Sequence, residues 1–153
     1  MDKITMTIDP GWNTGIAVWD GDILDEVTTI IEPRCNKALD ESVRLQWMWD
    51  EFHFISKRIK PDECVMEDAE TWAGSARSAA AATRGNTFTL AKLIGGYGLM
   101  CGVKWSVISV REWKGQLTKT ATAARVEMAL GRKFKTDHET DAVGIGLHLW
   151  GTL

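Results

Sequence analysis

The stretch ITMTIDPG, residues 4–11, decides the expected fold. Apolar side chains alternate with threonines over residues 4–8, which is the period of a β-strand that buries one face. The pattern stops at Asp9, because Pro10 and Gly11 favour a turn. The sequence therefore predicts a half-buried strand that carries an aspartate at its carboxyl end.

Four further strands are predicted downstream of this turn. Residues 16–19 and 26–31 are rich in β-branched and apolar side chains, and short turns separate them, so we expect antiparallel pairing with the first strand. Residues 63–67 form a short apolar run that is typical of a fully buried strand, and this run ends at Glu67. Residues 104–109 complete the set.

Helices are predicted between and after the last strands. Apolar side chains recur at helical spacing between Asp40, a favourable N-cap, and Pro61. Further helices are expected over residues 75–100, 110–117, 120–130 and 138–150. The predicted fold class is α/β, as one domain over residues 1–153. It has a five-stranded mixed sheet, of three antiparallel strands followed by two further strands, with helices on its faces.

Charge is distributed unevenly along the chain. The formal net charge is only -3, which is unusual for a nucleic-acid-binding protein. However, residues 71–136 hold 11 Lys and Arg against 2 Asp and Glu, a net charge of +9, whereas residues 1–70 have a net charge of -9. The basic middle segment fits either a DNA-binding surface or an ordinary solvated face.

Three acidic side chains lie where catalysis would need them. Asp9 and Glu67 end predicted strands, and Asp141 lies on the last predicted helix, three residues after His138 and therefore on the same helix face. Carboxylates from separate elements are the oxygen ligands that Mg²⁺ requires, and two such ions about 4 Å apart can hydrolyse a phosphodiester.

Several other classes of protein lack support in the sequence. The chain contains no phosphate-binding Walker loop, no nucleophile elbow and no HExxH motif. Its three cysteines are scattered, which argues against a disulfide framework or a zinc knuckle. Because no apolar run is long enough to span a bilayer, and no signal-peptide pattern opens the chain, we expect a soluble cytoplasmic protein without membrane contact.

The motifs together resemble a known family. IDPG at residues 8–11 with TGIA at 14–17, then VME at 65–67, then HETDAV at 138–143 are similar, in this order, to the successive motifs of RuvC-type Holliday junction resolvases. These enzymes have the RNase H-like fold. By this resemblance, Asp9, Glu67, His138 and Asp141 form the catalytic, metal-binding set for Mg²⁺ or Mn²⁺.

The resemblance also implies a function and partners. A RuvC-type resolvase is a homodimer that cuts four-way DNA junctions by symmetric nicks and leaves 5′-phosphates. Because His138 lowers the negative charge of the site relative to an aspartate, we expect activity with Mn²⁺ to exceed activity with Mg²⁺. The protein is expected to act in a bacterial cell, encoded by the bacterium or by a phage, and the compact chain with a histidine at this helix position favours a phage-type member.

The family pattern indicates which side chains contact DNA. Lys114, Lys119 and Arg125 correspond to basic residues that hold phosphates, and Arg77 is a further basic candidate. Trp72, on the loop after Glu67, is the candidate for stacking at an opened crossover, with core packing as the competing role.

Candidate dimer contacts lie on the helix expected over residues 75–100. Gly95, Gly96 and Gly98 would permit close approach of a second helix, although a kinked helix within a monomer fits as well. Trp47 and Trp49 lie two positions apart on one predicted helix and therefore point in different directions. They are not expected to face the core together, so one of them would be exposed at a partner surface.

Two alternative functions fit parts of the pattern. Asp9, Gly11 and Gly15 also match the opening motif of actin-like ATPases, but those proteins need a second lobe for which 153 residues leave no room. A non-catalytic nucleic-acid-binding relative is disfavoured, because every acidic position of the predicted site is filled.

Overall fold

The computed structural model describes residues 3–32, 40–69 and 86–153. Its five strands form one sheet in the order β3-β2-β1-β4-β5. Strand β2 pairs antiparallel with both β1 and β3. Strand β4 pairs parallel with both β1 and β5. This arrangement confirms the predicted mixed sheet. The bounds are Ile4–Asp9 for β1, Asn13–Asp20 for β2, Ile23–Ile31 for β3, Glu63–Glu67 for β4 and Lys104–Ile108 for β5.

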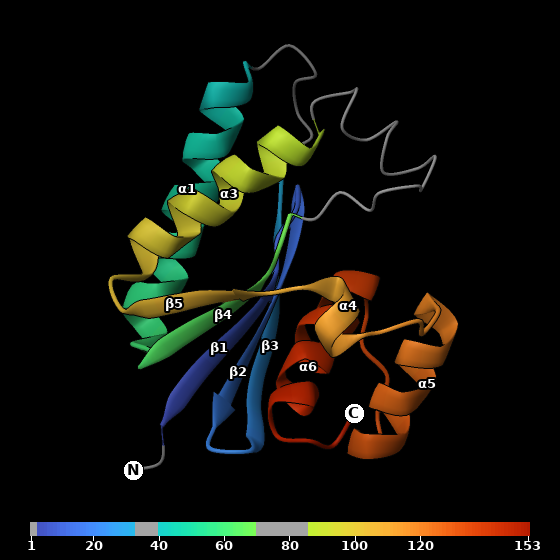
Figure 1. Ribbon diagram of the computed structural model, residues 1–153. Helices are drawn as coiled ribbons and strands as arrows, with labels where there is room; N and C mark the ends of the chain where they lie inside the picture. Colours follow the sequence, from blue (N-terminus) through green and yellow to red (C-terminus); the bar gives the residue numbers. More distant parts are fainter. Residues whose placement is uncertain (1–2, 33–39, 70–85) are drawn as a thin grey trace.

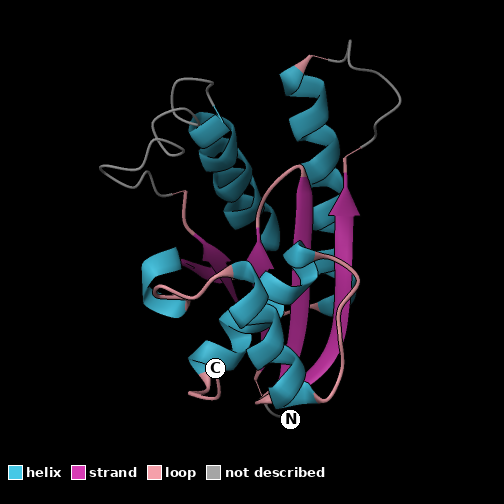
Figure 2. Cartoon of the chain, turned by 90° about the vertical axis from the view of Figure 1, so that its right-hand side faces the viewer, coloured by secondary structure: helices cyan, strands magenta, loops and turns pink. Residues whose placement is uncertain are grey.

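Helices cover both faces of the sheet. Helices α1 (Glu41–Ile59) and α3 (Asn86–Cys101) pack together on one face, as Figure 1 shows. The other face carries α6 (Asp137–Leu149), with α5 (Lys119–Leu130) packed against it and the short helix α4 (Val110–Trp113) nearby. Figure 2, which views the molecule from the side of α5 and α6, shows these helices in front of the sheet.

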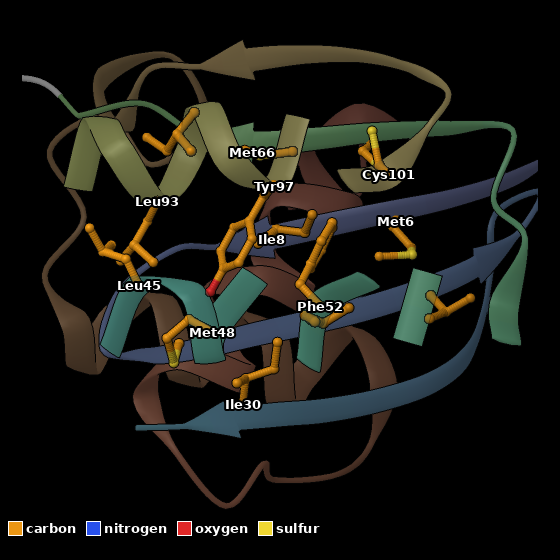
Figure 3. Packing of buried hydrophobic residues seen from close by; sticks show 14 residues of the cluster. Met6, Ile8, Ile30, Leu45, Met48, Phe52, Met66, Leu93, Tyr97 and Cys101 are labelled. Atoms are coloured by element: carbon orange, nitrogen blue, oxygen red, sulfur yellow. The ribbon is translucent and has the colours of Figure 1, made fainter. Parts of the chain in front are cut away.

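The period of two in the central strands divides the core into two layers. Met6 and Ile8 of β1 point towards α1 and α3, where they join Phe52 and Tyr97 in the largest buried cluster (Figure 3). Thr7 points to the opposite face, where its hydroxyl donates a hydrogen bond to the Ala142 carbonyl oxygen of α6 at 2.7 Å. The alternation read from residues 4–8 therefore places apolar side chains under one helical layer and small hydroxyl side chains under the other.

Most predicted elements are present, with shifted ends. Strand β2 begins at Asn13 and not at residue 16, because Asn13 and Thr14 already pair with the end of β3. The helix expected over 110–117 ends at Trp113, and Gly115 adopts a positive φ of 58° that stops it. Among the described helices none combines the length and the apolar character that crossing a membrane requires.

Two glycines of α3 are explained by contacts within the chain. A Cβ atom at Gly96 would lie 2.0 Å from the Trp49 indole nitrogen, and one at Gly98 would lie 2.4 Å from the Trp105 ring. The close approach expected at these glycines therefore accommodates tryptophans of α1 and β5. At Gly95 the space around a Cβ atom is open.

The expectation for the two tryptophans of α1 is wrong. Trp47 and Trp49 are both partly buried, and both pack against the cluster that contains Met48. The apolar stripe of α1 is wider than the sequence pattern indicated, because α3 covers one flank of this helix with Gly96 beside the Trp49 ring.

Candidate active site

Asp9 lies at the carboxyl end of β1, in the centre of the sheet. Its side chain is only 7% exposed, and its Oδ2 atom lies 2.7 Å from Nδ1 of His138. Burial raises the pKa of Asp9, and the hydrogen bond and positive charge of His138 act in the opposite direction. A carboxylate in this position needs a cation or a proton donor beside it.

The turn after Asp9 is held by a buried threonine. The Thr14 hydroxyl donates to the Gly11 carbonyl oxygen at 2.6 Å and accepts from the Gly11 N–H at 3.2 Å. The Thr14 hydroxyl oxygen also lies 2.9 Å from the Tyr97 hydroxyl of α3. The resulting network gives the aspartate at the strand end a rigid support.

Glu67 ends β4, the parallel neighbour of β1. The register pairs Ile8 with Met66, so the next residues along the two strands, Asp9 and Glu67, leave the sheet at the same edge. Burial, followed by the negative charge of Asp9, raises the pKa of Glu67 to about 7. The charge of Asp141 acts in the same direction, which indicates that the three carboxylates form one electrostatically coupled cluster.

The first turns of α6 bring the other two predicted ligands to this edge. Thr136 caps the helix, because its side chain accepts a hydrogen bond from the Glu139 N–H at 3.1 Å. His138 follows in the first turn and points to Asp9, whose hydrogen bond raises the pKa of the imidazole. Asp141 lies one turn further along α6, and its charge acts on both Asp9 and Glu67. The four predicted site residues, on β1, β4 and α6, therefore lie at one end of the sheet.

The close approach of α6 to the sheet depends on Gly15. A Cβ atom at this position of β2 would lie 2.0 Å from the His138 carbonyl oxygen and 2.9 Å from the Glu139 backbone nitrogen. Only a residue without a side chain lets α6 come this near to β2. The glycine of the TGIA motif thus sets the distance between His138 and strand β2.

Lys114 lies inside the carboxylate cluster. Its Nζ atom is 2.9 Å from Oδ1 and 3.0 Å from Oδ2 of Asp141, and the lysine side chain is only 10% exposed. We expected Lys114 to hold DNA phosphates at the surface. The structure places its ammonium group against Asp141, and contact with DNA at this residue stays a prediction.

The donor atoms fit divalent metal ions in kind. Three carboxylates and one imidazole nitrogen are ligands that Mg²⁺ and Mn²⁺ accept. In the described residues no three acidic, histidine or cysteine side chains are arranged to hold one ion as they stand. Lys114 supplies a positive charge at Asp141, and His138 supplies a proton donor at Asp9, so the site already attracts cationic groups to its carboxylates.

Two of the four remaining residues predicted to contact DNA lie in the described part of the chain. Lys119, the first residue of α5, is exposed and its Nζ lies 3.2 Å from an Asp137 carboxylate oxygen. Arg125 is exposed on the same helix. Trp72 and Arg77 lie outside the described residues.

One residue of the site escaped the sequence analysis. Trp113 is buried, and its indole N–H donates to Oε2 of Glu67 at 3.0 Å. The only sequence signal was general: a buried indole N–H usually finds an acceptor. Nothing in the local pattern indicated which acceptor it would be.

Comparison with solved structures identifies the fold. Two structures of RuvC from Thermus thermophilus, the first in complex with a Holliday junction substrate, align with TM-scores of 0.71 and 0.68 at 16% and 17% sequence identity. The alignments cover 98% and 97% of this chain, and 97% of each RuvC chain. The crystal structure of a yeast mitochondrial Holliday junction resolvase aligns with a TM-score of 0.62 and 11% identity, over 97% of this chain and 78% of that one.

Comparison by sequence gives no match, either to a protein-family model or to a curated protein. The structural alignments nevertheless extend over nearly the whole of this chain. The chain has the RuvC type of RNase H-like fold, as the motifs predicted.

Proposed function

We propose that this chain, which has the fold of RuvC-type resolvases, is a metal-dependent DNA endonuclease that cuts four-way junctions. The reaction is hydrolysis of one phosphodiester in each of two symmetrically opposed strands, with 5′-phosphate products. The observation that supports the proposal is the convergence of Asp9, Glu67, His138 and Asp141 at one edge of the sheet. A nucleic-acid-binding protein without catalysis would have no need to bury several carboxylates together.

Each residue has a role in this reaction. Asp9, Glu67, His138 and Asp141 would hold two divalent ions, which activate a water molecule and stabilise the leaving oxygen when bound. Lys114 neutralises Asp141 in the absence of metal, and it lies close enough to the cluster to approach a phosphate oxygen of bound DNA. The carboxylates, buried and mutually repulsive, favour any arrangement that brings more positive charge to them.

Two symmetric nicks require two active sites, so we propose a homodimer. Phe88 and Leu99 of α3 are 72% and 81% exposed, and with Gly95 they occupy positions i, i+7 and i+11 on one face of the helix. Since a Cβ atom at Gly95 meets no other atom, a second helix could approach this face closely. Gly95 is the one glycine of the predicted group on this open face.

The DNA would lie over the basic segment of the chain. Lys119 and Arg125 are exposed on α5, which packs against the helix that carries His138 and Asp141. Phosphate contacts by such residues position a duplex without reading its sequence. We therefore propose that α5 holds one arm of the junction beside the site.

A cleavage assay tests the proposed function. A synthetic four-way junction is incubated with Mg²⁺ or Mn²⁺, beside a linear duplex and a Y-shaped fork of the same sequence. We expect selective cutting of the junction by the wild type. Asp9→Asn and Asp141→Asn should retain junction binding in a gel-shift assay and lose cleavage. Absence of structure-selective cutting by the wild type would overturn the proposal.

A further inference from the structure

We propose that Trp113 is a positioning residue that fixes the Glu67 carboxylate in the site by donating its indole N–H to Oε2. The inference rests on the proposed function, because it assigns Trp113 to the same metal-binding cluster. The contact joins two residues that are far apart in the sequence, at an N···O distance of 3.0 Å. In the described part of the chain, Trp113 is the one side chain with a hydrogen bond to Glu67.

The indole is held rigidly in its own right. Trp113 is the last residue of α4, a helix whose N-cap Ser109 accepts a hydrogen bond from the Glu112 N–H at 3.0 Å. Its ring lies against α6 so closely that a Cβ atom at Gly144 would be 2.7 Å from ring atom Cζ3. The ring also packs with Val65 of β4 in a small buried cluster. The donor therefore has little freedom to follow a moving carboxylate.

Glu67 needs such a support more than Asp9 does. A glutamate has three side-chain torsions, and the strand end fixes only its backbone. The neighbouring charges of Asp9 and Asp141 repel the Glu67 carboxylate and would favour a rotamer that points away from the cluster. A rigid donor on Oε2 keeps the carboxylate at the sheet edge and leaves Oε1 for another partner.

The position of Trp113 links the two halves of the site. Its ring contacts α6 at Gly144, three residues after Asp141, and its N–H reaches the end of β4. The next residue, Lys114, contacts Asp141. The end of α4 thus supplies partners for two of the three carboxylates. Its last residue, Trp113, gives a neutral donor, and its C-cap, Lys114, gives a charge.

A role in packing alone is the competing explanation, and the chain offers a matched control. Trp19 is also fully buried, also lies against a glycine of α6, and also donates its indole N–H to a side-chain oxygen. Its acceptor is Thr7 Oγ1 at 2.9 Å, an uncharged hydroxyl that is not one of the four proposed metal ligands. Trp113→Phe and Trp19→Phe therefore remove the same kind of ring and the same kind of hydrogen bond, but only one of these bonds reaches a carboxylate of the site.

The test compares Mn²⁺ binding to the two full-length variants by calorimetry, without DNA. Loss of a partner that orients a metal ligand typically weakens metal affinity by about 10-fold to 100-fold. We expect a weakening in this range for Trp113→Phe and an affinity within about twofold of wild type for Trp19→Phe. Junction cleavage should follow the same order, with a lower kcat and unchanged junction binding for Trp113→Phe.

A second measurement does not depend on how well Trp113→Phe folds. The ¹H–¹⁵N spectrum of the metal-free protein is recorded above the pKa of Glu67, which is about 7, so that the wild-type acceptor is charged. The indole N–H signal of Trp113 should then move upfield in Glu67→Gln, because a charged acceptor is replaced by a neutral one. The Trp19 indole signal of the same sample should stay in place. Equal Mn²⁺ affinities of the two phenylalanine variants, or an unmoved Trp113 signal, would overturn the inference. The proposed function fails separately, if wild-type protein leaves junctions uncut.

Discussion

Gly15→Ala tests whether the approach of α6 to β2 sets the geometry of the site. The added Cβ would lie 2.0 Å from the His138 carbonyl oxygen, 2.3 Å from its carbonyl carbon and 2.9 Å from the Glu139 nitrogen. All three are backbone atoms, so no change of rotamer can relieve the overlap. Either β2 or the first turn of α6 must move.

The size of the effect follows from these distances. Ordinary contact requires a separation above about 3 Å, so the two backbones must part by about 1 Å or more. Overpacking of this kind costs about 1–3 kcal/mol of folding free energy, and more where only backbone can give way. Displacement of a catalytic group by about 1 Å can lower the rate by about 100-fold. The hydrogen bond of 2.7 Å between His138 and Asp9 would be lost.

Urea denaturation followed by tryptophan fluorescence measures the change in stability, and single-turnover junction cleavage measures the change in rate. Gly95→Ala is the control for the urea measurement alone, since Gly95 lies on the proposed dimer face. Within the chain its Cβ meets no atom, and alanine favours a helix by about 1 kcal/mol over glycine. We expect this control to be as stable as wild type or more so. A Gly15→Ala protein with wild-type stability and cleavage would refute the reasoning.

Four further predictions concern the charges of the site. Lys114→Met should tighten Mn²⁺ binding measured by calorimetry, because the ammonium group no longer competes for Asp141; unchanged or weaker binding would contradict this. The pKa of Glu67 is raised from 4.5 to about 7 and that of His138 is raised too, so the folded metal-free protein binds protons more tightly than the unfolded chain. Its free energy of unfolding should therefore fall as the pH rises from about 5 to about 8, and Glu67→Gln should flatten this decline in urea titrations at each pH. Lys119→Ala and Arg125→Ala should each lower the salt dependence of junction binding by about one unit of slope in a plot of log K against log salt, and an unchanged slope would exclude a phosphate contact. Cleavage with Mn²⁺ should exceed cleavage with Mg²⁺ at matched concentration, and the reverse order would contradict the role expected for His138.

Local patterns in the sequence predicted the elements that carry the site. The alternation over residues 4–8 predicted β1 and its terminal Asp9, and the apolar run over 63–67 predicted β4 with the bounds that the structure has. The spacing of His138 and Asp141 predicted a shared helix face. These features depend on the period of one strand or one helix, which neighbouring residues determine by themselves.

Contacts between side chains that are far apart in the sequence could not be predicted from such local patterns. The indole N–H of Trp113 reaches Glu67 across 46 positions of sequence, and the ammonium group of Lys114 reaches Asp141 across 27. Gly96 and Gly98 accommodate tryptophans of α1 and β5. The sequence by itself determined which residues end the strands and share the face of the last helix, because backbone period is local. Only the tertiary structure decided that Trp113 at the end of α4 and its C-cap Lys114 point into the carboxylate cluster, because that orientation depends on how α6 and the sheet edge pack around them.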